Sequence, residues 1–253
     1  MSAAAESETI AADAVDGRTA ELAENLAGLN KRIGAACRAA GRDPASVRLL
    51  PVTKFFPAAD VAILHRLGCR EFGESREQEA TAKAVELGGL VDVRWHMIGR
   101  LQRNKARTVA RWAYAVHSVD SERLAMALDT AARAAVEAGE RTDPVQVLVQ
   151  VSLDEDPGRG GVAPEELAAL ADRVADSAGL RLAGLMAIPP LDVDPTAAFA
   201  RLAAVHARLL RDHPGARELS AGMSGDLESA IEHGSTCVRV GTALMGARPI
   251  TSA

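Results

Sequence analysis

The stretch Val47-Arg-Leu-Leu-Pro-Val-Thr53-Lys54, followed by Phe-Phe-Pro, determines how this chain can fold. Its apolar run predicts a buried β-strand that ends at Thr53. A dinucleotide-binding open sheet would carry Gly-x-Gly-x-x-Gly after its first strand, and no such turn follows here. Lys54 therefore stands at the C-terminal end of the first strand. An amine held between apolar walls is neutral more readily than one in water, and a neutral amine can form a Schiff base with a carbonyl group.

Beyond this strand, short apolar runs alternate with helical patterns. The predicted strands are Val47–Thr53, Arg70–Phe72, Arg94–Ile98, Tyr114–Val119, Val145–Val151, Leu182–Ile188, Glu218–Ala221 and Cys237–Val240. Helices are predicted over residues 57–67, 75–87, 101–111, 121–138, 164–178, 196–212 and 226–233, and an amphipathic helix over 18–41 precedes the first strand.

This alternation predicts a parallel sheet, because parallel neighbours need crossover connections. Eight strand–helix units in about 210 residues favour an α/β fold with a single (β/α)8 TIM barrel and an extra N-terminal helix. An open doubly wound sheet is the main competitor. We expect one domain over residues 17–250 and a disordered tail over residues 1–16, which are small and acidic.

Composition excludes several classes of function. The chain has 253 residues, a net charge of −5 and only 3% aromatic residues, which argues against a nucleic-acid partner. Cys37, Cys69 and Cys237 lie far apart without a Cys-x-x-Cys motif, as expected in a reducing compartment and not in a disulfide framework or a zinc site. The six histidines lack metal-ligand spacing, so no metal is expected.

The sequence also predicts a cytoplasmic protein. Its first residues lack the cationic and apolar regions of a signal peptide. No uncharged stretch approaches the length that a membrane-spanning helix needs.

Two glycine-rich turns near the C-terminus, Ser-Ala-Gly-Met-Ser-Gly-Asp (220–226) and Val-Gly-Thr-Ala-Leu-Met-Gly (240–246), follow the last two strands. Phosphates often bind the loops after strands seven and eight of such barrels. Gly222 and Gly225 allow close backbone approach, and Ser224 offers a hydroxyl before a helix start, where free N–H groups favour an anion. Gly241 and Thr242 present N–H groups and a hydroxyl in the same way.

Closure of a barrel brings the first strand beside the eighth, and therefore Lys54 beside these turns. An aldehyde-trapping lysine next to a phosphate site predicts pyridoxal 5′-phosphate (PLP) as the ligand. Arg239 shares a strand face with Gly241 and would point into the barrel mouth, where its charge needs an acceptor. Taken singly, each feature has a structural interpretation: a snorkelling lysine, ordinary turn glycines or a structural ion pair.

A series of ordered motifs resembles the YggS/PROSC family of pyridoxal phosphate homeostasis proteins over roughly residues 20–248. The motifs are Thr53-Lys54, Phe72-Gly73-Glu74, Trp95-His96-Met97-Ile98-Gly99, Leu101-Gln102-Arg103-Asn104-Lys105, His117-Ser118-Val119-Asp120-Ser121, Gly184-Leu185-Met186, Gly222-Met223-Ser224-Gly225-Asp226 and Val238-Arg239-Val240-Gly241-Thr242.

The resemblance implies a barrel like the N-terminal domain of alanine racemase, with PLP bound as an internal aldimine on Lys54. It further implies the remaining cofactor contacts. Ser224, Gly241 and Thr242 would contact the phosphate with Met223 beside them, and Arg239 would face the pyridine nitrogen. A cation there disfavours ring protonation and makes the cofactor a poorer electron sink.

The chain departs from the family pattern in two places. Ser75 stands where most members carry asparagine near the cofactor, and its side chain is shorter and has no amide N–H. Arg159 lies in a loop where the family has an acidic–Ser–Lys pattern, either in place of that lysine or within a divergent loop.

Other polar residues admit two interpretations. The basic residues Arg100, Arg103, Lys105, Arg107 and Arg111 are either an anion or partner site or, more in keeping with helical spacing, a solvated face. His96 and His117 are either ligand contacts or barrel filler.

Two functions remain in competition. The first is a non-catalytic carrier that binds PLP for intracellular homeostasis, with apo PLP-dependent enzymes as candidate partners and a monomer or a weak dimer expected. The second is a PLP-dependent amino-acid racemase or related fold-type III enzyme, which needs acid–base groups on both faces of the cofactor. In alanine racemases a tyrosine from a second domain supplies one of them. Tyr114 is the only tyrosine here and is predicted at the bottom of the barrel, with no second domain expected, so the carrier is favoured and no catalytic residue is assigned. A Schiff-base aldolase acting on a sugar phosphate is a third possibility, although its lysine usually lies on a later strand.

Overall fold

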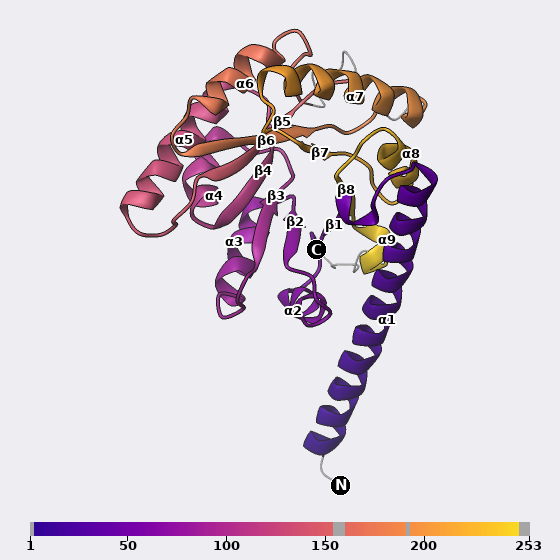
Figure 1. Cartoon of the computed structure of the whole chain (residues 1–253). Helices are drawn as coiled ribbons and strands as arrows, with labels where there is room; N and C mark the ends of the chain where they lie inside the picture. The colour runs from indigo at the N-terminus through magenta and orange to yellow at the C-terminus, as the bar shows by residue number, and fades with distance from the viewer. Residues whose placement is uncertain (1–2, 154–159, 191–192, 248–253) are drawn as a thin grey trace.

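Eight parallel strands form a barrel that is wrapped by helices, as the computed structural model shows for residues 3–153, 160–190 and 193–247 (Figure 1). The strands are β1 (Arg48–Pro51), β2 (Glu71–Glu74), β3 (Arg94–Met97), β4 (Ala113–Val119), β5 (Val145–Gln150), β6 (Leu180–Met186), β7 (Glu218–Ser220) and β8 (Cys237–Val240). Their order is β1-β8-β7-β6-β5-β4-β3-β2. The predicted TIM barrel is confirmed.

Closure of the barrel between β1 and β2 depends on a short contact. Val52 forms an isolated parallel bridge with Gly73. The Thr53 N–H also donates to the Gly73 carbonyl at 3.0 Å. On the other side of β1, Leu50 pairs with Arg239 of β8. The first strand therefore lies between the second and the eighth, as the sequence predicts.

The helices fill the crossovers. They are α1 (Ala3–Ala39), α2 (Ala58–Arg66), α3 (Glu77–Glu86), α4 (Ala106–Trp112), α5 (Glu122–Glu137), α6 (Leu167–Ala175), α7 (Pro195–Asp212), α8 (Leu227–Glu232) and α9 (Thr242–Met245), with 3₁₀ turns η1 (Pro44–Ser46) and η2 (Arg103–Lys105). The predicted helix over 101–111 is thus split into η2 and α4. Neither η1 nor α9 was expected.

The first helix differs most from expectation. Sequence analysis placed it over 18–41 behind a disordered tail of residues 1–16, whereas the backbone of α1 is helical from Ala3. The segment is rich in alanine and glutamate, which favour helix, and one glycine within a long helix costs only about 1 kcal/mol. The domain limits 17–250 remain a prediction.

Side chains of the strands alternate between two apolar layers. Val145, Val147 and Val149 of β5 belong to the large cluster that includes residues of the surrounding helices. Leu148, between them, packs instead with Met186 in a small separate cluster. This alternation follows from the two-residue period of a strand that is buried on both faces.

One glycine sets the spacing between β6 and β7. A Cβ atom added at Gly184 would lie 1.8 Å from the backbone oxygen of Glu218. No side chain fits there, so the glycine permits the close approach of these two strands.

A buried ion pair fixes the backbone just after β1. Lys83 of α3 donates to Glu74 Oε1 at 2.6 Å and to the Thr53 carbonyl at 2.8 Å, and Thr53 Oγ1 donates to the same carboxylate oxygen at 2.6 Å. Burial raises the pKa of Glu74, and the charge and hydrogen bonds of Lys83 and Thr53 offset only part of that rise. These contacts fix the residue that immediately precedes Lys54.

Lys83→Met should destabilise the protein by about 3–5 kcal/mol, because the Glu74 carboxylate would remain buried without its partner. Urea denaturation measures the change. Lys31→Met is the matched control: Lys31 is exposed on α1, and a substitution at such a surface position changes stability by about 0.5 kcal/mol or less. Equal stability losses in the two variants would contradict this assignment.

Candidate functional site

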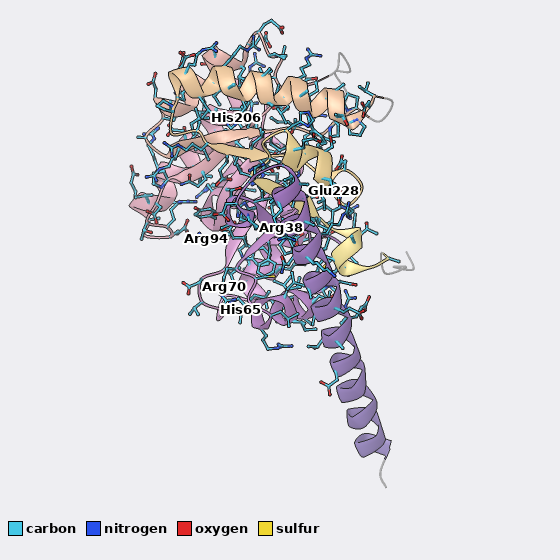
Figure 2. The ribbon with its side chains drawn as sticks, turned by 45° about the vertical axis from the view of Figure 1, so that its right-hand side comes forward. Arg38, His65, Arg70, Arg94, His206 and Glu228 are labelled. Atoms are coloured by element: carbon cyan, nitrogen blue, oxygen red, sulfur yellow. The ribbon has the colours of Figure 1, made fainter. Side chains whose placement is uncertain are left out.

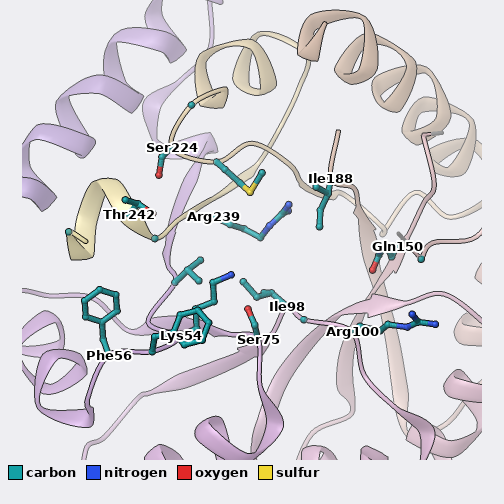
Figure 3. A pocket seen from close by; sticks show the side chains of 18 residues that line it. Lys54, Phe56, Ser75, Ile98, Arg100, Gln150, Ile188, Ser224, Arg239 and Thr242 are labelled. Atoms are coloured by element: carbon teal, nitrogen blue, oxygen red, sulfur yellow. The ribbon is translucent and has the colours of Figure 1, made fainter. Parts of the chain in front are cut away.

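A cavity of about 590 Å³ lies at the C-terminal ends of the strands, and its volume is within the usual range for small-molecule sites (Figure 3). Its lining residues come from both ends of the chain and from the strand ends between them: Val52, Lys54, Phe55, Phe56, Ser75, Ile98, Gly99, Arg100, Gln150, Gly160, Ile188, Met223, Ser224, Gly225, Arg239, Gly241, Thr242 and Gly246. All seven residues that the sequence singled out as cofactor contacts line this one cavity.

Lys54 enters the cavity from the end of β1. Figure 3 shows its amine directed into the cavity. The next residue, Phe55, has a φ of 70°, a left-handed conformation that is uncommon for a residue with a side chain. The Phe55 N–H donates to Glu79 Oε2 at 3.1 Å, and the Arg76 guanidinium lies 4.7 Å from the Phe55 ring centroid. This fixed turn directs the chain away immediately after Lys54.

The two glycine-rich loops, 220–226 after β7 and 240–246 after β8, lie next to each other on one side of the cavity, where Figure 3 shows Ser224 near Thr242. The Ala243 N–H donates to Ser224 Oγ at 3.4 Å, which joins the loops directly. Gly222 has a φ of 91°, and a Cβ there would approach the Ala230 Cβ to 2.6 Å. The loops thus bring backbone N–H groups and the hydroxyls of Ser224 and Thr242 to one side of the cavity, a donor set suited to a phosphate.

Helix α1 holds both glycine-rich loops from outside the barrel. Arg18 donates to the Met245 carbonyl at 3.0 Å, Asn25 to the Leu244 carbonyl at 2.9 Å, and Arg32 to the Ser224 carbonyl at 2.7 Å. The three donors are spaced seven residues apart and therefore share one face of the helix.

A salt bridge of α8 supports the same contact. Arg32 also pairs with Glu228, with Nη2 2.6 Å from Oε2. The extra N-terminal helix is therefore part of the scaffold of the site.

Arg239 forms the floor of the cavity. Its Nη1 donates to the carbonyl and the hydroxyl of Ser220 at 2.7 and 2.8 Å, and its Nη2 donates to the Ala187 carbonyl at 3.0 Å. The side chain is buried, and burial lowers the pKa of the guanidinium below its usual value without neutralising it. No carboxylate pairs with it among the described residues, so the sequence alternative of a structural ion pair is wrong. Its charge faces the cavity with only neutral partners.

Ser75 reaches the cavity from the loop after β2. A Cβ at Gly99 would lie 2.2 Å from the Ser75 backbone oxygen, so the loop after β3 packs directly against the Ser75 backbone. Gly99, Ile98, Gln150 and Ile188 line the cavity but were not predicted as site residues. The signal was available, because each lies within one residue of the end of a predicted strand, on the side where barrel ligands bind.

The remaining polar candidates have other roles. Of the five basic residues after β3, only Arg100 lines the cavity, while Lys105 and Arg111 pair with Glu77 and Glu140 at 3.3 and 3.0 Å. The interpretation as a largely solvated face is correct for these two.

His96 and His117 lie fully buried inside the barrel and do not line the cavity, which agrees with barrel filler. Tyr114, at the start of β4, packs against His96 with ring centroids 5.5 Å apart, away from the cavity. Arg159 lies outside the described residues.

No cluster of three or more His, Cys, Asp or Glu side chains suited to a metal ion occurs in the described part of the chain. Among the same residues, none of the helices combines the length and apolar character needed to cross a lipid bilayer.

The donor set fits a ligand with an aldehyde at one end and a phosphate at the other, as in PLP. Lys54 supplies an amine, Ser224 and Thr242 supply hydroxyls across the cavity, and Arg239 supplies an unpaired cation between them. Apolar side chains such as Val52 and Ile188 complete the walls around a flat ring.

Comparison with known proteins agrees with this geometry. Residues 21–249 match the family model of the alanine racemase N-terminal domain. The pyridoxal phosphate homeostasis protein of Mycobacterium bovis is 55% identical, over 93% of this chain and 96% of the relative. That of Escherichia coli is 38% identical, over 90% and 97% of the two chains.

Solved structures show the same fold. PipY of Synechococcus elongatus, solved with PLP bound, is 37% identical with a TM-score of 0.76 and covers 89% of this chain and all of its own. Alanine racemase of Corynebacterium glutamicum is 15% identical with a TM-score of 0.63, which speaks for the fold alone; the match covers 93% of this chain and 62% of that enzyme. With a barrel of this topology and relatives of this identity over nearly its full length, the chain belongs to the family of pyridoxal phosphate homeostasis proteins.

Proposed function

We propose that this protein binds PLP in the described cavity, as a Schiff base on Lys54, and serves intracellular PLP homeostasis as a carrier. The observation that supports this most is the placement of one lysine amine and two glycine-rich loops on opposite sides of the same cavity. PipY, the 37% identical relative, binds PLP on the same fold. Apo PLP-dependent enzymes are the proposed recipients.

Lys54 would hold the cofactor by condensing its amine, in the unprotonated form, with the aldehyde; this needs no co-reactant, and the aldehyde oxygen would leave as water. Ser224, Gly241 and Thr242 would donate hydrogen bonds to the phosphate from the two loops. Ser75 and Met223 complete the set of contacts.

Arg239 determines what the bound cofactor can do. A guanidinium next to the ring nitrogen donates a hydrogen bond and disfavours a proton on that nitrogen, since two cations would repel each other. The unprotonated ring stabilises a carbanion poorly, which suits storage of PLP better than catalysis.

The cavity also offers little acid–base chemistry. The ionisable side chains that line it, among the described residues, are Lys54, Arg100 and Arg239. Racemisation needs a proton donor and a proton acceptor on opposite faces of the cofactor. This favours the carrier over the second candidate, a PLP-dependent racemase or related fold-type III enzyme.

Lys54→Ala should abolish labelling by PLP and borohydride, which reduces a Schiff base to a stable amine. Mass spectrometry of tryptic peptides locates the label. Lys105→Ala, a surface lysine outside the cavity, should label like the parent protein. Undiminished label on another lysine in Lys54→Ala would refute the assignment.

Ser224→Ala and Thr242→Ala should each weaken PLP binding by about 1–3 kcal/mol, roughly 5- to 150-fold in Kd, because a phosphate oxygen loses a hydrogen-bond donor. Fluorescence titration of the apo protein with PLP measures this. Thr130→Ala, which removes a hydroxyl bonded within α5 on the surface, is the control and should leave Kd unchanged. Unchanged affinity in both cavity variants would place the phosphate elsewhere.

The PLP-loaded protein should not racemise a panel of L- and D-amino acids above the rate of its Lys54→Ala variant. Chiral chromatography after incubation with each amino acid detects turnover. Rapid, Lys54-dependent appearance of the opposite enantiomer would favour the racemase over the carrier.

A further inference from the structure

A line of buried polar side chains crosses the interior of the barrel beneath the cavity. His96 Nδ1 lies 2.9 Å from His117 Nε2, and His117 Nδ1 lies 3.0 Å from Ser220 Oγ. Ser220 Oγ in turn accepts from Arg239 Nη1 at 2.8 Å. At the other end, His96 Nε2 lies 3.2 Å from Glu71 Oε2, which also lies 2.9 Å from Arg48 Nε, and these three buried atoms have no hydrogen-bond partner of good geometry among the described residues. The line joins β2, β3, β4, β7 and β8.

The Glu71 carboxylate at one end of this line sets the direction of the hydrogen bonds in it. Glu71 is ionised and can only accept, so His96 Nε2 must carry the proton that faces it. In a neutral imidazole, His96 Nδ1 is then an acceptor, and His117 Nε2 must donate to it. His117 Nδ1 is left as an acceptor for the Ser220 hydroxyl proton.

The opposite end is compatible with the same arrangement. Arg239 can only donate, so the oxygen of Ser220 must accept from it. A serine hydroxyl that accepts from Arg239 is free to donate its own proton, and His117 Nδ1 receives it. One proton assignment therefore satisfies the whole chain from Arg239 to Glu71.

The surroundings keep both histidines neutral and Glu71 charged. Burial lowers the pKa of His96 despite its contact with Glu71. Burial, the neighbouring His96 ring and the charges of Arg239 and Arg48 lower the pKa of His117 well below its usual value.

Burial would raise the pKa of Glu71, but the hydrogen bond from His96 and the charge of Arg48 outweigh it and bring the pKa to about 2. Arg48 Nε lies 2.9 Å and Arg94 Nη1 3.3 Å from this carboxylate, and Arg48 also pairs with Glu218 at 2.7 Å. Cys237 is buried close by, and burial raises the pKa of its thiol, so it too stays neutral.

A proton cannot pass through this chain into the cavity, because a guanidinium does not give up its proton at any physiological pH. The arrangement is therefore suited to orientation and not to proton transfer. Of the five residues in this hydrogen-bonded line, Arg239 is the one that lines the cavity, and it is therefore the residue that the line orients.

We propose that Ser220 and His117, tethered through His96 to Glu71, are positioning residues for Arg239 and hold its guanidinium toward the ring of the bound cofactor. The chain presents the Ser220 oxygen, and not its proton, to Arg239. Without this constraint the hydroxyl can rotate and the guanidinium loses one of its three fixed acceptors. The link to the cofactor rests on the proposed function, whereas the direction of the hydrogen bonds does not.

The direction of the hydrogen bonds made by His96 and His117 can be tested in the protein without cofactor. NMR of protein labelled with ¹⁵N-histidine distinguishes the two neutral tautomers and the imidazolium at each ring. We expect His96 and His117 to be neutral at pH 7 with the proton on Nε2. An Nδ1–H tautomer or an imidazolium at His117 would overturn the inference.

The positioning role is tested with PLP carrying ¹⁵N in its ring. Ser220→Ala and His117→Phe should shift the ring-nitrogen resonance and raise Kd for PLP about 5- to 10-fold. His206→Phe is the matched control, since His206 of α7 is buried and bonded to the Ala216 carbonyl at 2.8 Å, outside the chain (Figure 2). It should change neither quantity.

Each outcome has a separate meaning. If Lys54 is labelled by PLP but Ser220→Ala leaves the ring-nitrogen resonance unchanged, the positioning role is wrong and the proposed function stands. If Lys54 is not labelled at all, the proposed function is wrong, while the tautomers still decide the direction of the chain. Ser220→Ala removes a single atom, so it serves even if His117→Phe does not fold.

Discussion

Closure of the barrel between β1 and β2 is the constraint on which the site depends. That junction consists of the Val52–Gly73 bridge and the buried contacts among Thr53, Glu74 and Lys83. It holds β1 in the ring next to β8, so that residues almost at opposite ends of the sequence share one cavity. The ion pair is costly to bury and gives little net stability as such. Its value is geometric, because it fixes the backbone from which Lys54 projects.

The interior of this barrel is unusual because it contains polar side chains. Most TIM-barrel interiors are filled by branched apolar side chains. Here the interior contains two histidines, a serine and an arginine, and hydrogen bonds link Arg239 through Ser220 and His117 to His96. At the far end, His96 Nε2 meets Glu71 only in a close contact of 3.2 Å. Arg239 itself has three acceptors, two on Ser220 and one on Ala187, and these hold its cation beneath the cavity without a carboxylate partner among the described residues.

Much of this was predictable from sequence, and the reason is topological. The strand–helix alternation predicts the barrel, and parallel strands place their C-terminal ends on one rim, so residues at strand ends, such as Lys54 and Thr242, could be assigned to one site. The features that escaped prediction depend on contacts between distant residues. The left-handed Phe55, the pressure of Gly99 on Ser75 and the pairing of His96 with His117 leave no local pattern in the sequence. The backbone of α1 begins at Ala3 and not near residue 18, because an acidic, small-residue segment has both a disordered and a helical interpretation, and the tail over residues 1–16 stays a prediction.

The seven-residue spacing of Arg18, Asn25 and Arg32 has a consequence for how this family member can vary. Each residue of an α-helix advances the side-chain direction by 100°, so seven residues return almost to the same bearing. Substitutions on the outer side of α1 leave that bearing intact. Gain or loss of one residue between Asn25 and Arg32 would swing Arg32 about a quarter-turn or more away from the Ser224 carbonyl, with every strand untouched. These contacts therefore constrain the number of residues between Arg18, Asn25 and Arg32 more than they constrain the composition of the helix.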